Sequence, residues 1–134
     1  MQSFNALVGR FGLSLLFIIS GIGKLAAYAG TQQYMVAAGV PGALLPLVIL
    51  VELGGGLAIL AGAFTRPVAI VLALFTIASA ILFHANLADQ NQFIHLLKNI
   101  AIAGGFLTLA AHGAGSISID ALRRKSAIAG NASA

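Results

Sequence analysis

The feature that most constrains this chain is a succession of four long apolar segments that carry almost no charge. Hydrophobic residues make up 60% of the sequence and charged residues only 7%, whereas soluble domains carry about 25% charged residues. A chain of 134 residues with so few charges cannot cover its surface with polar groups. Each segment has roughly the 20 apolar residues that a helix needs to cross a bilayer. We therefore predict an integral membrane protein.

Helices suit these segments better than strands do, because a helix satisfies its own backbone hydrogen bonds in lipid and no segment alternates with a barrel's period of two. Short connections favour antiparallel neighbours. The expected fold is all-α, a four-transmembrane-helix antiparallel bundle. We also expect a short interfacial helix between the first two spans, capped by Thr31 and ended by Gly39. The predicted spans are Phe4 to Ala27, Ala43 to Phe64, Pro67 to Phe83 or His84, and Phe93 to Ala111.

The length allows one domain, which we place at residues 1–125. Residues 126–134 are small and featureless, so we predict a disordered tail. The N-terminal apolar run ends near Ala27-Tyr28-Ala29, which loosely resembles a signal cleavage site. Arg10 interrupts that run, whereas a signal peptide carries its positive charge before the run, so we predict a retained first helix.

Basic residues give the orientation of the bundle. Arg66 and the cluster Arg123-Arg124-Lys125 fall on one side of the predicted membrane, and the connections 29–42 and 85–92 contain no Lys or Arg. The positive-inside rule then places both termini in the cytoplasm.

Several classes of site and partner are not expected. The chain has no cysteine, which excludes disulfides, thiolate zinc sites and cysteine-ligated iron–sulfur clusters within it. The basic residues form no patch with interleaved aromatics, so no nucleic-acid partner is expected. His84 and His95 lie near helix ends beside a short loop, a poor arrangement for haem, and no carboxylate completes a metal site there.

Glu52 is one of only three acids, and it lies near mid-depth in the second span. An ionisable group there costs about 2.5–3.5 kcal/mol. Arg10 and Lys24 share one face of the first span, and either side chain is long enough to reach Glu52. We predict a structural ion pair between Arg10 and Glu52, with Lys24 as the alternative partner, and a catalytic role for Glu52 as proton acceptor or relay. A purely structural role for this carboxylate stays open.

Small residues follow Glu52. Gly54, Ala58 and Gly62 have the small-xxx-small spacing that lets a neighbouring helix approach closely. We expect this row to bring the first span toward Glu52.

A second set of polar residues begins the fourth span. His95, Lys98 and Asn99 are spaced to share one helical face, and His84 ends the third span on the same side of the membrane. With Lys24 they form a predicted cationic cup that has Glu52 at its floor. The predicted ligand-binding residues are Lys24, His84, His95, Lys98 and Asn99.

Several motifs follow one another along nearly the whole chain. They are Arg10, F-I-I-S-G-I-G-K at 17–24, G-V-P-G at 39–42, V-E-L-G-G-G-L-A-I-L-A-G at 51–62 with T-R at 65–66, L-K-N-I-A-I-A-G-G-F-L at 97–107 and G-A-G-S-I-S-I-D at 113–120. Their order resembles that of the DoxX family of small four-helix membrane proteins. The resemblance implies a bacterial inner-membrane location and a quinone-linked oxidoreductase or quinol-oxidase type of subunit. It also implies that Arg10, Lys24, Glu52, Lys98 and Asn99 stand at recurrent motif positions of that family.

Three functions are compatible with these features. The first is a redox subunit that binds a quinone or a small anionic or aromatic ligand, with a partner subunit as the electron store. The second is a small-solute transporter, which would need a homodimer because four short helices show no inverted repeat. The third is a membrane scaffold that docks a partner enzyme through its basic tail.

Overall fold

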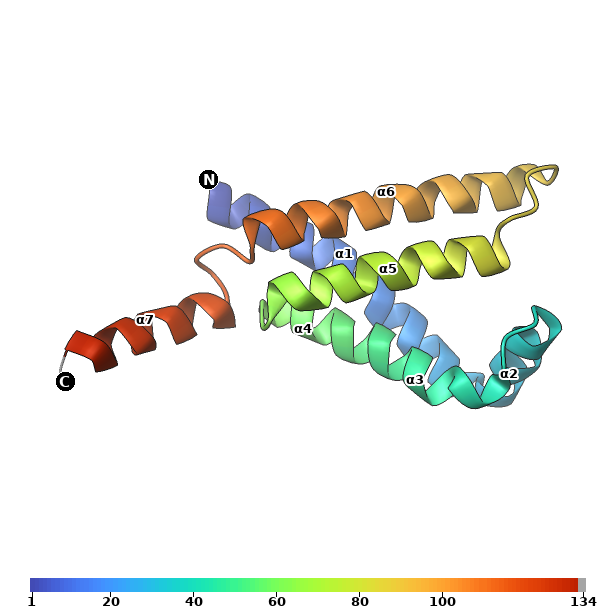
Figure 1. The fold of residues 1–134 in the computed structure, drawn as a ribbon, viewed down its shortest axis with the longest axis horizontal. Helices are drawn as coiled ribbons and strands as arrows, with labels where there is room; N and C mark the ends of the chain where they lie inside the picture. Colours follow the sequence, from blue (N-terminus) through green and yellow to red (C-terminus); the bar gives the residue numbers. More distant parts are fainter. Residues whose placement is uncertain (133–134) are drawn as a thin grey trace.

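The computed structural model describes residues 1–132, and these are helical apart from turns and short connections, with no strand. Four helices are long and apolar enough to cross a membrane, at Ser3–Ala26, Gly42–Ala61, Thr65–Phe83 and Gln90–His112. The predicted spans and the all-α fold are thereby confirmed (Figure 1). The elements are α1 (Gln2–Ala26), α2 (Tyr28–Ala37), η1 (Gly42–Leu44), α3 (Leu45–Ile49), η2 (Leu50–Gly54), α4 (Gly55–Ala61), α5 (Thr65–Phe83), α6 (Gln90–His112) and α7 (Ile119–Ala132).

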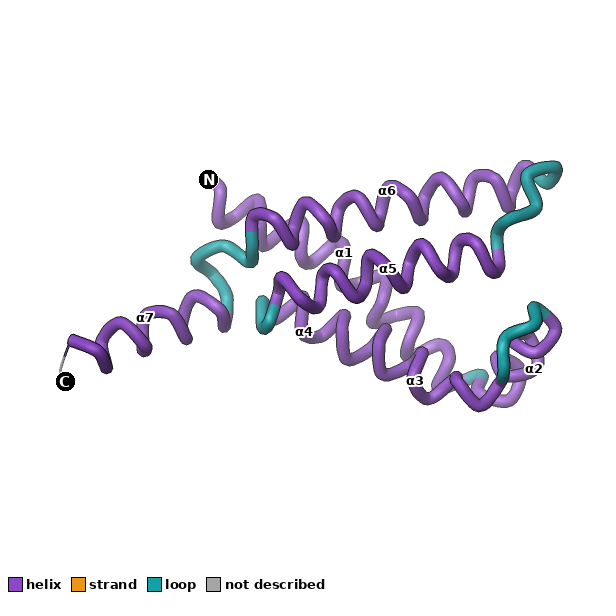
Figure 2. The backbone as a smooth tube through the Cα atoms, viewed as in Figure 1, coloured by secondary structure: helices purple, strands orange, loops and turns teal. Residues whose placement is uncertain are grey.

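The spans are arranged as two pairs. α1 packs along η2 and α4, while α5 and α6 form an antiparallel hairpin (Figure 2). The pairs meet around a core that contains Phe17, Leu72 and Phe106, with the ring of Phe17 edge-on to that of Phe106 at 5.3 Å between centroids. Toward the end that carries α2, the pairs diverge (Figure 1). The bundle is therefore tightly packed at the end near the termini and open at the α2 end.

Glycines allow α1 to lie close to the second span, as predicted. A Cβ on Gly56 would lie 3.2 Å from the Ile18 backbone nitrogen, and one on Gly21 would lie 2.9 Å from Leu53 Cβ. The predicted small-residue row is wrong in detail, however. Gly54 is exposed, and a Cβ there would meet only Leu50 of its own helix. The reason is helical phase, because two residues turn a helix by about 200° and Gly56 is the glycine that faces α1.

The interfacial helix between the first two spans is confirmed as α2. It begins at Tyr28 rather than at Thr31, whose hydroxyl donates to the Ala27 carbonyl oxygen at 2.9 Å from within the helix, so the predicted cap is wrong. Gly39 follows the end of α2 with a φ of +80°, a conformation that favours glycine. Tyr34 stacks on Phe83 at 5.3 Å between ring centroids and thereby ties α2 to the end of α5.

The C-terminal segment differs from the predicted disordered tail. α7 continues through residues 126–132, which are rich in alanine, the residue with the best helix propensity. It projects away from the bundle beyond the packed end (Figures 1 and 2). Residues 133–134 of the predicted tail lie outside the described residues.

Candidate functional site

A cavity of about 730 Å³ lies between the two helix pairs where they diverge. Helices α1, α2, α5 and α6 and the first half of the second span all contribute to its walls. Most of its lining is apolar. Every residue predicted for the polar cup is part of the lining: Lys24, Glu52, His84, His95, Lys98 and Asn99. The sequence therefore located the members of one cavity, although their roles stay predictions.

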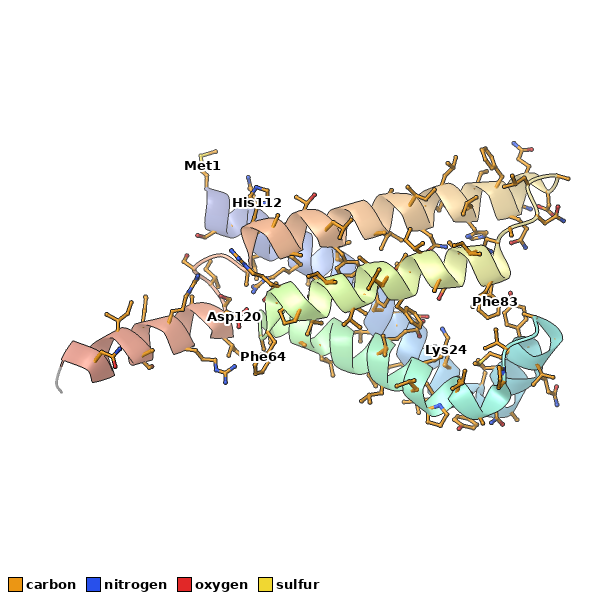
Figure 3. All side chains as sticks on the ribbon, in the orientation of Figure 1. Met1, Lys24, Phe64, Phe83, His112 and Asp120 are labelled. Atoms are coloured by element: carbon orange, nitrogen blue, oxygen red, sulfur yellow. The ribbon has the colours of Figure 1, made fainter. Side chains whose placement is uncertain are left out.

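Lys24 and Glu52 form an ion pair at the floor of this cavity. Lys24 Nζ lies 2.8 Å from Glu52 Oε2, and it donates a hydrogen bond to Oε1 at 3.0 Å. It also donates to Ser20 Oγ at 2.7 Å, one helical turn earlier. The Glu52 side chain is 8% exposed and that of Lys24 is 26% exposed, so the pair is accessible from the lysine side. Figure 3 labels Lys24 and Phe83, which lie on the two helix pairs that bound the cavity.

The predicted ion pair between Arg10 and Glu52 is wrong. Arg10 lies at the packed end of α1, where its Nη2 donates to the carbonyl oxygen of Ile117 at 2.7 Å. Helical phase correctly put Arg10 and Lys24 on one face of α1, but the two lie at different depths. The partner of Arg10 is Ile117, which lies 107 positions away in the chain. Local sequence patterns cannot predict a contact between such distant residues.

Glu52 sits inside η2, the π-helical turn of the second span. Such turns are rare and occur frequently at functional sites, because the extra residue redirects nearby side chains. This turn was not predicted from the sequence. Its signal is the run of three glycines that begins two residues after Glu52, since glycine is a poor former of a regular helix interior.

The mouth of the cavity carries two stacked histidines. The rings of His84 and His95 lie 5.0 Å apart between centroids at 24°, and His84 Nδ1 is 2.6 Å from Gln92 Oε1. With that carbonyl oxygen as acceptor, Nδ1 carries the proton of the His84 ring. Across residues 1–132 no three His, Cys, Asp or Glu side chains are grouped so as to hold a metal ion.

Lys98 and Asn99 complete the wall that α6 presents to the cavity. Neither side chain has a hydrogen-bond or ion-pair partner among the residues that the structure describes. Both groups are therefore available as donors to a ligand.

Five residues of the lining carry hydroxyl groups that were not predicted as part of the site. They are Ser20, Thr31, Tyr34, Thr76 and Ser79. The Thr76 hydroxyl donates to the Leu72 carbonyl oxygen at 2.7 Å, so it is already occupied as a donor. Ser20 lies four residues before Lys24, a spacing that places both on one helical face and could have identified it.

A second hollow, of about 590 Å³, lies between α2 and the start of the second span. Its lining contains Gln32 and Gln33 but no charged side chain. We therefore place the candidate site in the larger cavity.

At the packed end, Arg10 is 1% exposed. Besides the bond to Ile117, its Nε and Nη1 have no hydrogen-bond partner among the described residues. Gly62 makes room for the guanidinium, because a Cβ on Gly62 would collide with Nη1. The φ of Gly62 is +67°, so glycine is required there for its backbone as well.

Asp120 ties the start of α7 to the turn between α4 and α5. Its carboxylate accepts from the backbone N–H groups of Phe64 and Thr65, each at 2.9 Å, and its own N–H donates to the Gly62 carbonyl oxygen at 2.9 Å. Phe64 has a φ of +48°, a strained conformation for a residue with a side chain, which these bonds hold. Phe64 and Asp120 lie side by side in Figure 3. We call residues 117–120 with these contacts the C-terminal clasp.

The charge of Asp120 is stabilised by its surroundings. Burial alone would raise the pKa of Asp120, but the hydrogen bonds from Thr65 and Phe64 and the nearby charge of Arg123 outweigh it. The pKa therefore lies below its usual value of 3.8. Arg123 also stands 4.5 Å above the centre of the Phe64 ring.

The chain belongs to the DoxX family, whose model matches residues 5–85. It is 52% identical over 125 residues to the inner membrane protein YqjF of Escherichia coli (strain K12), covering 93% of this chain and 96% of that one. It is 37% identical over 121 residues to the inner membrane protein YphA of the same organism, covering 85% and 86%. No solved structure matches the chain. The resemblance predicted from the motifs is confirmed, and the protein is an integral inner-membrane member of this family.

Proposed function

We propose that this DoxX-family protein binds a quinone, or a similar small aromatic or anionic molecule, in the cavity between its helix pairs. The observation that carries the proposal is the cavity itself: a mainly apolar space of about 730 Å³ within the spans, with polar groups gathered at its floor and mouth. Such a space is typical of small-molecule sites. Lys98 and Asn99 would donate hydrogen bonds to a ligand carbonyl or anionic oxygen.

In this proposal, the ion pair at the floor handles protons. Reduction of a quinone takes up protons together with electrons, and Glu52 and Lys24 are a pair of ionisable groups in the lining of the cavity. Lys24 is partly exposed, so it would link the buried carboxylate to a proton source. The electrons would come from a flavin or haem centre of a partner subunit, for which this chain would be the membrane-embedded quinone site.

The test is ligand binding by the purified protein. Native mass spectrometry should find a quinone bound, and added ubiquinone-1 should raise the melting temperature in mild detergent. Lys98→Met should abolish most of that rise, because it removes a donor from the cavity wall. Lys125→Met is the matched control, since it removes a cation outside the cavity.

Absence of bound quinone together with no quinone-dependent rise in melting temperature would contradict the proposal. Transport would be the better proposal if proteoliposomes took up an aromatic anion in a manner that requires Glu52 and the protein did not respond to quinone.

A scaffold role has one observation in its favour. α7 projects from the bundle and carries three consecutive cations, Arg123, Arg124 and Lys125 (Figure 1). Removing the segment from Ser116 onward would also remove the C-terminal clasp, so truncation there does not isolate docking from folding. Arg124→Glu with Lys125→Glu keeps the clasp intact. Loss of partner co-purification in this variant, with quinone binding unchanged, would support docking.

A further inference from the structure

The polar groups of the cavity come from all of its walls, and the rest of the lining is apolar. α1 and α6 supply Ser20, Lys24, His95, Lys98 and Asn99, and the second span and α5 with its C-cap add Glu52, Thr76, Ser79 and His84. We call the side chains of Val40, Leu44, Val48, Ala78 and Leu82 the apolar wall. A ligand that fits this lining must itself have a polar part and an apolar part.

The apolar wall reaches the outside of the bundle. Leu44 and Leu82 line the cavity, yet they are 43% and 53% exposed. Each therefore forms part of an edge between the cavity and the exterior. α3 packs chiefly on α1 and α2, and the contact between the second span and α5 is made mainly by α4 at the packed end.

Both leucines belong to segments that are long and apolar enough to cross a membrane. Leu44 lies near the start of the span Gly42–Ala61, and Leu82 lies near the end of the antiparallel span Thr65–Phe83, so both belong to the same end of the bundle. The Tyr34 and Phe83 rings stack and join α2 to α5 at that end. Leu44 and Leu82 are apolar, so an opening between them suits the apolar part of a ligand.

We propose that the ligand carries a long apolar tail, isoprenoid or acyl, that leaves the cavity sideways between Leu44 and Leu82 into the surrounding lipid. Its polar head lies at Lys98, Asn99 and the Lys24–Glu52 pair. The inference rests on the proposed function and narrows its substrate class to lipid-soluble molecules drawn from the bilayer.

The experiment compares a tailed and a tailless quinone on variants that obstruct the opening. Leu44→Trp and Leu82→Trp place a large ring at either edge. Leu47→Trp and Ile81→Trp are matched controls, because these neighbouring side chains are 56% and 62% exposed and do not line the cavity. The probes are ubiquinone-2, which has a short isoprenoid tail, and ubiquinone-0, which has none. Dissociation constants are measured by native mass spectrometry in one detergent.

The readout is the ratio of the two affinities, since partitioning of the tail into detergent cancels between variants. Each edge variant should weaken ubiquinone-2 binding about tenfold, equivalent to the burial of about two methylene groups. Ubiquinone-0 binding should change little, and both controls should keep the wild-type ratio. Melting curves confirm that each variant is folded, and the two edges are obstructed independently, so one poorly folded variant leaves the other decisive.

If both edge variants bind the two quinones in the wild-type ratio, the lateral opening is wrong while quinone binding stands. Equal weakening of both quinones would also overturn it, because the substitutions would then act on the site of the head group. If the wild-type protein binds neither quinone, the proposed function is wrong and the tail proposal falls with it.

Discussion

At the scale of single residues, the ion pair between Lys24 and Glu52 accounts for the most unusual acid of the sequence. A carboxylate in a membrane span is costly alone, and here a lysine lies within 3.0 Å of both its oxygens. A serine hydroxyl shares the same ammonium group. The pair joins two helices, and its lysine is partly exposed. A structural role and a proton-handling role for Glu52 are therefore compatible.

Substitutions can separate these two roles. Lys24→Met should lower the free energy of unfolding by about 1–3 kcal/mol, less than the 3–5 kcal/mol typical of a fully buried pair, because the Lys24 side chain is partly exposed. The double variant Lys24→Met with Glu52→Gln should recover part of this loss, since no uncompensated charge remains. Thermal unfolding in detergent measures both. A double variant that is less stable than Lys24→Met would contradict a structural role for the pair.

At the scale of secondary-structure elements, close contact between α1 and the second span depends on which glycine faces the neighbour. Gly21 and Gly23 lie two residues apart on α1. A Cβ on Gly21 would lie 2.9 Å from Leu53 Cβ, whereas a Cβ on Gly23 would meet nothing within 4 Å.

These two glycines should respond with opposite signs to the same substitution. Gly21→Ala should destabilise the bundle by about 1–3 kcal/mol through overpacking against η2. Gly23→Ala should stabilise it by up to about 1 kcal/mol, because alanine is the better helix former. Melting temperatures of the two variants test the contact, and equal shifts would show that α1 does not pack on the second span through Gly21.

The C-terminal clasp gives a prediction about acid. Asp120 has a folded-state pKa below its usual value, so its stabilising effect is present above the unfolded pKa of about 3.9 and is lost as pH falls through the folded one. Near neutral pH, Asp120→Ala should cost about 0.5–2 kcal/mol, as for other lost helix caps. The gap in melting temperature between wild type and Asp120→Ala should narrow below about pH 4. A gap that is independent of pH would exclude a role for the carboxylate charge.

At the scale of the whole molecule, the cations predict the orientation of the bundle. Arg66 and the three cations of α7 belong to the end near the termini, whereas the loop between α5 and α6 has none. We expect the termini in the cytoplasm and that loop outside.

The lack of native cysteine makes this test direct. In intact bacterial cells whose outer membrane has been made permeable, a single cysteine at Ala88→Cys should react with a membrane-impermeant maleimide. One at Ala127→Cys should react only after the inner membrane is opened. The reverse pattern would invert the proposed topology.

The sequence predicted those features that depend on local pattern. The lengths of the apolar segments predicted the four spans. The spacing of polar residues along the fourth span, together with their distance from its end, predicted Lys98 and Asn99 as cavity residues. It failed where a contact joins distant segments: Arg10 takes its acceptor from Ile117, beyond the last span. It also failed for the row of small residues, because Gly56 rather than Gly54 faces α1.

The bond between Arg10 and Ile117 has a consequence for biogenesis. Arg10 is synthesised 107 residues before its acceptor. Until Ile117 has been made, the guanidinium lacks its partner, and the α4–α5 turn lacks the carboxylate of Asp120. The packing of the first helix is therefore completed only after all four spans have been synthesised. A chain that is cut before Ile117 retains an unmatched cation in its first span, which is costly in lipid.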